Sequence, residues 1–357
     1  VTAIHSLTDE IVPPPAEDSW HGEAAPSDWK VWSEASMKLL KRPATLINKV
    51  QHLVPGVIRA TRQSAGHKAP PHPPLVRCRF NGPVSSTRVT DALIMQLDEI
   101  KAIRRSVEGA TVNDVIVAIV GGGLRKYLQS KDELPATTLS CTAPINMRSE
   151  RNSASSGNQV SNMTISMATD IAEPLQRLRE VNRSATESKA FAEALGTSVI
   201  MDVSEIMAPQ ALGWGWRAAS LAAANSNIPM PFNTVISNVP GPQQTLYLAG
   251  ARLDLIMGMG PLLHTMGLFH AVFSGAGRIT INFLSCREML PDPGFYQRCL
   301  REAFEELREA AAKQVRRESR QSAKPKAGPK ARAKAKPAAK PKAKAKAKRV
   351  ARRKSSR

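Results

Sequence analysis

The stretch that decides the fold is residues 111–128, with the sequence TVNDVIVAIVGGGLRKYL. Thr111 and Asp114 form a capping-box-like pair, in which each side chain takes up a backbone N–H that the first turn of a helix leaves unpaired. The apolar residues recur at intervals of three and four, which predicts an amphipathic helix with one face turned to a core. They are Val112, Val115, Ile116, Ile119, Val120, Leu124 and Leu128.

Three consecutive glycines, Gly121–Gly123, lie inside this helical pattern. A glycine-rich loop that binds phosphate is followed by Lys and then by Ser or Thr, and that pair is missing here. Glycine within a helix lets a neighbouring backbone or helix approach closely. We therefore favour close helix packing over phosphate binding for this segment.

The segments on either side alternate between the strand period and the helix period. We predict strands at residues 88–97, 138–143, 160–167, 234–237, 271–273 and 279–284, and helices at residues 98–107, at residues 172–194 and from Asp292 onward. This mixture indicates an α/β protein. The length is sufficient for a core of one large or two ordinary domains.

The charge of the chain is concentrated at its C-terminal end. The 357 residues carry 50 Lys and Arg against 30 Asp and Glu, a formal net charge of +20, but 16 of those bases and none of the acids lie in residues 321–357. Residues 1–320 are nearly neutral, at +4. The Lys, Ala and Pro repeats of the tail contain no aromatic residue, so we predict a disordered segment that binds a polyanion, either nucleic acid or an anionic lipid surface.

Residue counts exclude several kinds of site. The four cysteines lack a C-x-x-C pair and the seven histidines lack metal-ligand spacing, so we expect no zinc site, no disulfide framework and no bound cofactor. The longest apolar run, residues 115–124, is too short to span a bilayer. His264 and His270 lie in an apolar, glycine-rich stretch and either face a pocket or are satisfied structural histidines. We favour the structural role.

Residues 29–60 show apolar side chains at helical spacing, with lysines and arginines on the other side. One interpretation is a helix that lies on a membrane surface. The other is an ordinary helix that packs its apolar stripe on a core, and we favour this second interpretation.

Six short blocks of sequence follow one another along the chain. They are Thr111–Val115 (TVNDV), Ala143–Glu150 (APINMRSE), Gly157–Ser161 (GNQVS), Ser237–Pro242 (SNVPGP), Tyr247–Ala251 (YLAGA) and Arg287–Pro293 (REMLPDP). Each block is weak alone, but the ordered set is specific. In order and rough spacing the blocks resemble the bacterial wax ester synthase/diacylglycerol acyltransferase family over about residues 1–312.

The resemblance implies a fold like that of the CoA-dependent acyltransferases, with two similar α/β halves and a tunnel between them. It also implies transfer of a fatty acyl group from acyl-CoA, a co-substrate, to diacylglycerol or a long-chain alcohol. In the family, the second His of a His-His-x-x-x-Asp-Gly motif is the general base. This chain lacks the motif: no His precedes His5, and Glu10 follows Asp9 where Gly is required. We therefore expect a fragment whose general base lies upstream of Val1.

The family blocks point to supporting residues within this chain. Asn113 and Asp114, at the second and third helical positions, are expected to satisfy backbone donors and to brace a neighbouring loop, a role favoured over direct chemistry. Asn238, Pro240 and Gly241 follow a predicted strand. They form either a turn that shapes the tunnel wall or a plain structural turn.

Arg148 follows a predicted strand end and either contacts a phosphate of CoA or forms a surface salt bridge. The resemblance divides the chain into the remainder of an N-terminal acyltransferase domain (residues 1–130), a C-terminal domain (residues 131–315) and the disordered tail (residues 316–357). It predicts a cytoplasmic protein that is peripheral to the inner membrane or to lipid droplets.

Two alternatives to this function remain open. One is a non-catalytic protein that binds a membrane or nucleic acid through its basic tail. The other is a related condensation or acetyltransferase domain that uses a different acceptor.

Overall fold

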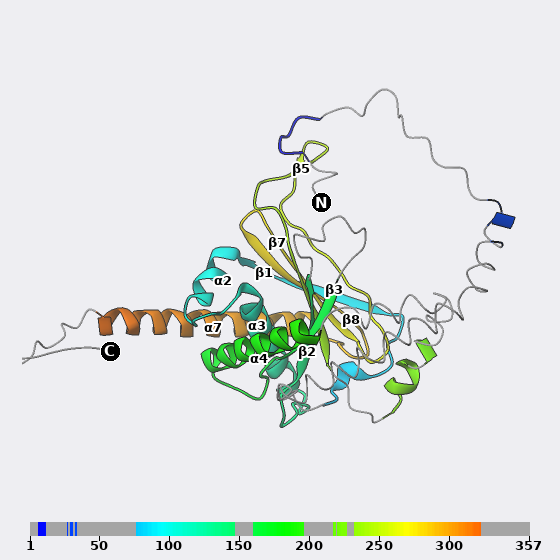
Figure 1. Ribbon diagram of the computed structural model, residues 1–357, viewed down its shortest axis with the longest axis horizontal. Coiled ribbons are helices and arrows are strands. Elements are labelled where there is room, and N and C mark those ends of the chain that lie inside the picture. The colour runs from blue at the N-terminus through cyan, green and yellow to red at the C-terminus, as the bar shows by residue number, and fades with distance from the viewer. Residues whose placement is uncertain are drawn as a thin grey trace, which may run out of the picture. The chain divides into compact units, whose positions relative to one another are not determined.

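The computed structural model describes residues 6–11, 76–146, 160–195 and 232–322, together with residues 27, 29–30, 33, 217–218 and 220–226 (Figure 1). Most of the predicted amphipathic helix at residues 29–60 and all of residues 323–357 lie outside this part of the chain, and so does Arg148. The chain divides into two units, residues 1–316 and 317–357. All strands belong to the first unit.

The centre of the first unit is a six-stranded mixed sheet in the order β1-β8-β7-β4-β2-β3 (Figure 1). β4 pairs in parallel with β7 and with β2, whereas the other neighbours are antiparallel. The strands span Arg88–Gln96 (β1), Ser140–Asn146 (β2), Val160–Ser166 (β3), Thr234–Pro240 (β4), Leu268–Gly275 (β7) and Arg278–Cys286 (β8). All six were predicted from the sequence, although β4, β7 and β8 are longer than expected and β2 lies further along the chain than the predicted residues 138–143.

The helices are α2 (Leu97–Arg104), α3 (Val112–Gln129), α4 (Pro174–Leu195) and α7 (Pro293–Ser322), and a 3-10 turn, η2, spans Arg79–Asn81. Pro174 occupies the first position of α4, where the missing N–H is harmless. On α7, one stripe of side chains is buried in the core, at Cys299, Leu300, Ala303, Phe304 and Leu307. The helix continues to Ser322, so the predicted disorder is wrong for residues 316–322, where helix-forming Arg and Glu extend the last turns.

Helix α3 is the centre of the hydrophobic core. Every residue from Asp114 to Leu124 is buried, so the helix is enclosed on all sides rather than amphipathic. The glycines explain how this is possible, as predicted. A methyl group on Gly121 would lie 2.2 Å from the Met167 carbonyl oxygen, and one on Gly123 would lie 2.6 Å from the Leu300 side chain.

Segments that precede α3 and segments that follow it along the chain contribute to the same core. Strand β1 lies before α3 and pairs over its whole length with β8, near the other end of the chain, from Arg88 opposite Cys286 to Gln96 opposite Arg278. Side chains of both strands, including Leu93 and Phe283, belong to one contiguous cluster with α3. The proposed boundary near residue 130 therefore does not separate two independent cores among the described residues.

A second sheet of two short strands, β5 (Tyr247–Leu248) and β6 (Ala251–Arg252), was not predicted. Ala249 and Gly250 join the strands with φ values of 49° and 81°, the left-handed geometry of a tight hairpin. Ser6 pairs with Tyr247 through two backbone hydrogen bonds of 2.9 Å. The beginning of the chain thereby adds to the edge of this hairpin.

None of the helices in the described ranges combines the length and the apolar character that crossing a membrane requires.

Candidate functional site

The start of α3 carries the first predicted pair of site residues. The Asp114 carboxylate accepts a hydrogen bond of 2.8 Å from the Thr111 N–H, and the Thr111 hydroxyl accepts one of 3.2 Å from the Asp114 N–H. Asn182 of α4 donates to the same carboxylate at 3.0 Å and to the Gly109 carbonyl at 3.2 Å. The predicted capping box is confirmed, and Asp114 also ties α4 to the loop before α3. Asn113 is half-buried and takes no part in this cap.

The second predicted group lies at the end of β4, and its description needs a correction. Asn238 and Pro240 do not follow the strand, because β4 continues to Pro240, which pairs with Ser274 of β7. Proline is tolerated there because the β2 pairing with β4 involves only Thr234 and Val235 among the described residues, which leaves the far end of β4 an open edge.

Gly241 continues the contact between β4 and β7 by one residue. Its N–H donates to the Ser274 carbonyl at 2.7 Å, and a methyl group here would lie 2.4 Å from that oxygen. The position therefore requires glycine because of the close approach of two backbones. Pro242, the next residue, accepts a hydrogen bond from Ala276 N–H at 3.2 Å.

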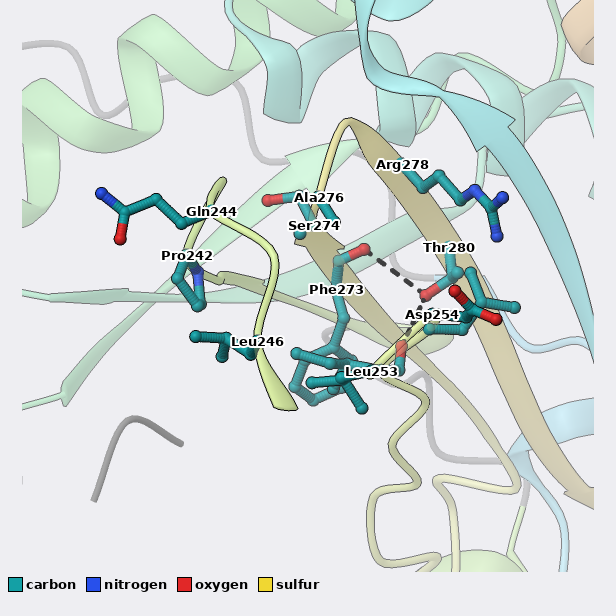
Figure 2. A pocket seen from close by; sticks show the side chains of 13 residues that line it. Pro242, Gln244, Leu246, Leu253, Asp254, Phe273, Ser274, Ala276, Arg278 and Thr280 are labelled. Atoms are coloured by element: carbon teal, nitrogen blue, oxygen red, sulfur yellow. Dashed lines mark hydrogen bonds between the residues drawn. The ribbon is translucent and has the colours of Figure 1, made fainter. Parts of the chain in front are cut away.

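A pocket opens beside this strand end, between residues 242–256 and the β7–β8 hairpin. It is partly open, and about 350 Å³ of space lies between these segments when the part open to solvent is counted. Figure 2 shows the apolar side chains of Leu246, Leu253 and Phe273 close together on one side, with Thr280 and Arg278 on the β8 side. The sequence indicated only the Pro-Gly-Pro turn at residues 240–242 and missed the other lining residues.

His270 is a structural histidine, as favoured from the sequence. It is completely buried, and its ring nitrogens lie 3.0 Å from the Thr234 hydroxyl and 2.8 Å from the Tyr296 hydroxyl. Because Thr234 donates to the Leu268 carbonyl, we assign Nδ1–H as the donor to Thr234 and Nε2 as the acceptor from Tyr296. Burial lowers the pKa of His270 to about 3, so the ring is neutral.

His264 is also engaged in the structure, since its Nδ1 accepts a hydrogen bond of 3.1 Å from the Val84 N–H. Neither described histidine is therefore placed as a free general base.

An ion pair connects the beginning of α7 to the end of α3. Lys131 and Asp292 are 2.6 Å apart, and the Tyr127 hydroxyl donates to the same carboxylate at 2.6 Å. Burial alone would raise the pKa of Asp292, but the hydrogen bonds from Lys131 and Tyr127 outweigh it, and the pKa is lowered. The family block that ends in Asp292 and Pro293 thus serves to fix a helix start.

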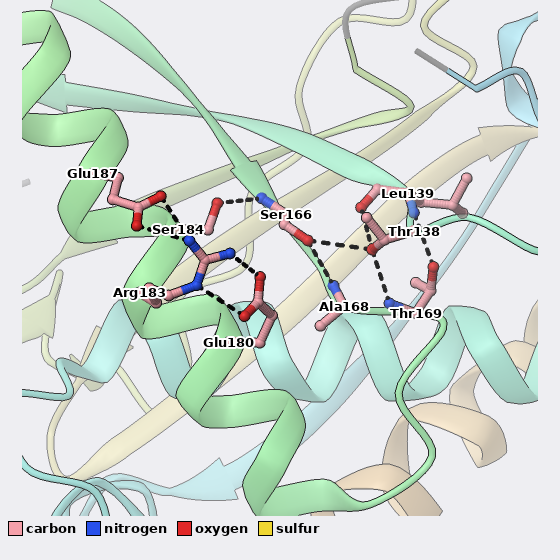
Figure 3. A network of polar contacts seen from close by, with 9 residues as sticks. All are labelled: Thr138, Leu139, Ser166, Ala168, Thr169, Glu180, Arg183, Ser184 and Glu187. Carbon is pink, nitrogen blue, oxygen red and sulfur yellow. Dashed lines mark hydrogen bonds and ion pairs between the residues drawn. The ribbon is translucent and has the colours of Figure 1, made fainter. Parts of the chain in front are cut away.

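A further polar network joins β3 to α4 (Figure 3). Ser184 of α4 accepts from the Ser166 N–H at 2.9 Å, and the Ser166 hydroxyl lies 3.2 Å from that of Thr138. Arg183 pairs with Glu180 and Glu187 on the outer face of α4 (Figure 3). The first contacts lock the helix to the sheet edge, whereas the half-exposed arginine contributes little stability.

The two predicted groups are separate in the structure. Asp114 lies in the helical layer, whereas Gly241 borders the pocket at the strand end, and no hydrogen bond joins them among the described residues. In the same ranges, no three His, Cys, Asp or Glu side chains converge as a metal site requires. The described ranges thus offer a pocket and two braced helix starts.

Both parts of the chain match models of a known protein family. A family model described as the wax ester synthase/diacylglycerol acyltransferase catalytic domain matches residues 3–116, and one described as the WS/DGAT C-terminal domain matches residues 156–308. Together they cover about three quarters of the chain, in the family's order. The chain belongs to the wax ester synthase/diacylglycerol acyltransferase family.

Two family relatives from Mycobacterium tuberculosis carry the provisional name diacylglycerol O-acyltransferase. One is 34% identical over 231 residues, which are 64% of this chain and 44% of the relative. The other is 30% identical over 272 residues, which are 76% of this chain and 52% of the relative. The chain therefore spans about half the length of these relatives.

A solved structure of the family, the wax ester synthase/diacylglycerol acyltransferase from Marinobacter aquaeolei VT8, superposes with a TM-score of 0.53 at 24% identity. The match covers 87% of this chain and 63% of that one. This likeness shows the fold, and the predicted α/β class of the CoA-dependent acyltransferases is confirmed.

Proposed function

We propose that this protein is an O-acyltransferase that moves a fatty acyl group from acyl-CoA to diacylglycerol or to a long-chain alcohol. The observation that supports it is the ordered match of a catalytic-domain model and a C-terminal-domain model to one chain. The continuous sheet is consistent with this, because β1, from the first matched region, and β8, from the second, pair over nine residues.

The reaction needs a general base, and we propose that this base is a histidine in sequence that precedes Val1. Its role is to take the proton of the acceptor hydroxyl while that oxygen attacks the thioester carbonyl and the CoA thiolate leaves. The 357 residues contain no His-His-x-x-x-Asp-Gly motif. His264 and His270 are occupied by Val84, Thr234 and Tyr296.

The predicted site residues have supporting roles in this proposal. Asp114, with Asn113 beside it, holds the loop at Gly109 and α4 in place. Asn238, Pro240 and Gly241 set the strand end that borders the pocket. Arg148 is proposed to contact a phosphate of CoA, since a guanidinium donates to phosphate oxygens in pairs.

The proposed partners are acyl-CoA, the lipid acceptor and an anionic membrane or lipid-droplet surface in the cytoplasm, with residues 321–357 as the contact. Sixteen Lys and Arg without an acid support binding to an anionic surface, at about 1 kcal/mol for each base near the lipid. Nucleic acid is the competing polyanion. A comparison of vesicle and DNA binding by chains with and without residues 321–357 distinguishes the two.

The experiment that tests the function compares the 357-residue chain with the same chain extended by its in-frame upstream sequence. Each is incubated with palmitoyl-CoA and either dioleoylglycerol or hexadecanol, and the release of free CoA thiol is followed. We expect release only from the extended chain, and only when an acceptor is present. An upstream sequence without the histidine motif, or an extended chain inactive with both acceptors, would contradict the proposal.

A further inference from the structure

Exposed apolar side chains gather on the β5–β6 hairpin and on the strap that follows it, residues 253–263. Of the eleven large apolar side chains that are exposed in the described ranges, seven belong to residues 7–11 and 239–263. The most exposed of the seven, at 50–69%, define what we call the hairpin–strap surface. They are Leu7, Ile11, Leu248, Met257 and Met259. Single exposed apolar residues are normal, whereas a gathering of them marks a site of interaction.

The hairpin carries the first part of this surface. The backbone of Ser6 pairs with that of Tyr247 through two hydrogen bonds of 2.9 Å, and Figure 1 shows residues 6–11 beside β5, apart from the helices. A methyl group on Gly250 would lie 3.0 Å from the Ile11 side chain, so Ile11 rests on the turn of the hairpin. The start of the chain is therefore already seated on this surface.

The strap lies on the face of the sheet that is turned away from the helices. Phe269 and Phe273 of β7 are on that face, because Val272, which alternates with them, packs into the core with the helices. A methyl group on Gly258 would lie 2.3 Å from the Phe273 ring, and one on Gly260 would lie 2.3 Å from the Phe269 ring. The two glycines thus let the strap backbone lie directly on the rings.

The two methionines of the strap point away from the sheet. Met257 and Met259 alternate with the glycines that contact the rings, and their side chains are 54% and 69% exposed. The Leu253 N–H donates to the Leu246 carbonyl at 2.7 Å, which joins the start of the strap to the hairpin. The strap therefore covers the sheet with its inner side and presents an uncovered apolar outer side next to the hairpin.

The charged side chains next to this surface favour a protein over an anionic lipid as its occupant. Asp9 and Glu10 are exposed beside Ile11, and Arg252 is paired with Asp254 at 2.9 Å. An anionic lipid surface attracts clusters of Lys and Arg, and it repels exposed acids.

The path of the chain identifies which protein segment can reach the surface. Five residues span at most about 18 Å when fully extended, so any sequence that precedes Val1 ends within that distance of Ser6 on the hairpin. The matched regions of two relatives make up 44% and 52% of their lengths, so about half of each relative has no counterpart in this chain.

We propose that the hairpin–strap surface is the docking site for the part of the protein that precedes Val1. Docking removes the exposed leucine, isoleucine and methionine side chains from water, and the unbranched methionines adapt to the shape of the segment that covers them. The interface rests on the proposed function, since the same part of the protein is proposed to carry the general base. It places that part on the strap side of the sheet and leaves the helical layer uncovered.

The test compares the 357-residue chain with the chain extended by its in-frame upstream sequence, both without substrate. Each is exposed to a brief pulse of hydroxyl radicals, and the oxidation of individual side chains is measured by mass spectrometry. Oxidation follows exposure, so we expect Met257 and Met259 to react at least about fivefold more slowly in the extended chain. Val315 of α7, which is 44% exposed and lies outside the surface, is the internal control and keeps its rate.

A pair of variants tests the same interface by stability. In the 357-residue chain Met259→Lys places a lysine at an exposed position, and we expect no change in the midpoint of thermal unfolding. In the extended chain the same lysine is buried without a partner, and the midpoint falls by about 3 °C or more. Val315→Lys is the matched control and leaves the midpoint unchanged in both chains.

Equal oxidation of Met257 and Met259 in the two chains would overturn the proposal, and so would an equal effect of Met259→Lys on both. Protection of the 357-residue chain that appears only at higher protein concentration would assign the surface to a second copy. Protection that appears only with phosphatidylcholine vesicles would assign it to a lipid surface, and either result would also overturn the proposal. Neither measurement reads acyl transfer, so failure of the interface and failure of the proposed function are seen separately.

Discussion

Gly121 shows how one residue determines the packing of the whole core. The carbonyl of Met167 approaches α3 so closely that a methyl group would lie 2.2 Å from its oxygen, and backbone cannot move aside as a flexible side chain can. We expect Gly121→Ala to lower the free energy of unfolding by about 1–3 kcal/mol, in spite of alanine's better helix propensity.

The matched control for this prediction is Gly294→Ala, which also lies in a helix but has nothing within 4 Å of the added methyl group. There we expect no loss and a gain of up to about 1 kcal/mol. Urea unfolding of both variants measures the difference. Equal effects at the two positions would contradict close packing as the reason for the glycine.

A second prediction for a single residue concerns His270 and the stability of the protein in acid. Its pKa is about 3 in the folded protein against 6.5 as the ordinary value, so the unfolded chain takes up the proton first as the pH falls. The stabilisation is complete above pH 6.5 and is lost on the way down to pH 3. Between pH 7 and pH 5 we expect this residue alone to remove about 2 kcal/mol.

The measurement is the free energy of unfolding at both pH values for the unaltered chain and for His270→Gln. The variant is less stable at pH 7, because Tyr296 and Thr234 lose their partner, but its stability falls about 2 kcal/mol less between the two pH values. Parallel losses in the two proteins would show that His270 does not stay neutral in the fold.

At the scale of elements, the start of α3 is the feature that links a predicted motif to tertiary structure. The Asp114 carboxylate takes one hydrogen bond within its own helix and one from Asn182 of α4. We expect Asp114→Ala to lower the free energy of unfolding by about 2 kcal/mol, since a helix cap and a contact between helices are lost together. Chemical denaturation measures this loss.

Asp98→Ala provides the control for the cap. Asp98 also lies in the first turn of a helix, but its side chain is 91% exposed and pairs only with Lys101. We expect a loss of a few tenths of a kcal/mol there. Equal losses of unfolding free energy in the two variants would show that the hydrogen bond from Asn182 to Asp114 does not contribute to stability.

The elements themselves were largely readable from the sequence, and the exceptions have physical causes. The helix and strand periods identified α2, α3, α4, α7 and all six strands of the large sheet. The end of β4 was missed because Pro240 normally ends a strand, and only the open edge beside it makes it acceptable. β5 and β6, at two residues each, are too short to show a period.

The site was predictable only in part, for a related reason. Asp114 was found because its partner Thr111 is three residues away, so the signal is local. The pocket beside the end of β4 was not, because its lining comes from segments on both sides of β7, which become neighbours only through strand pairing.

At the scale of the whole molecule, the chain has a family fold but spans about half the length of the relatives. The order β1-β8-β7-β4-β2-β3 brings residues 88–96 and 278–286 together, a pairing that no local pattern indicates and that was not predicted, since the expected boundary at residue 130 placed the two segments in different domains. The net charge of +20 says little about this fold, because residues 1–320 account for only +4 of it.

The dependence of acyl transfer on a histidine outside these 357 residues is the proposal on which the others rest. It is tested most directly by incubating the upstream-extended protein with radiolabelled palmitoyl-CoA and dioleoylglycerol or hexadecanol, and separating the lipids by chromatography. We expect labelled triacylglycerol or wax ester, and a loss of at least about a hundredfold when the second His of the upstream motif is replaced by Ala. Labelled product at the same rate without that histidine, or no product from the intact extended protein, would contradict it.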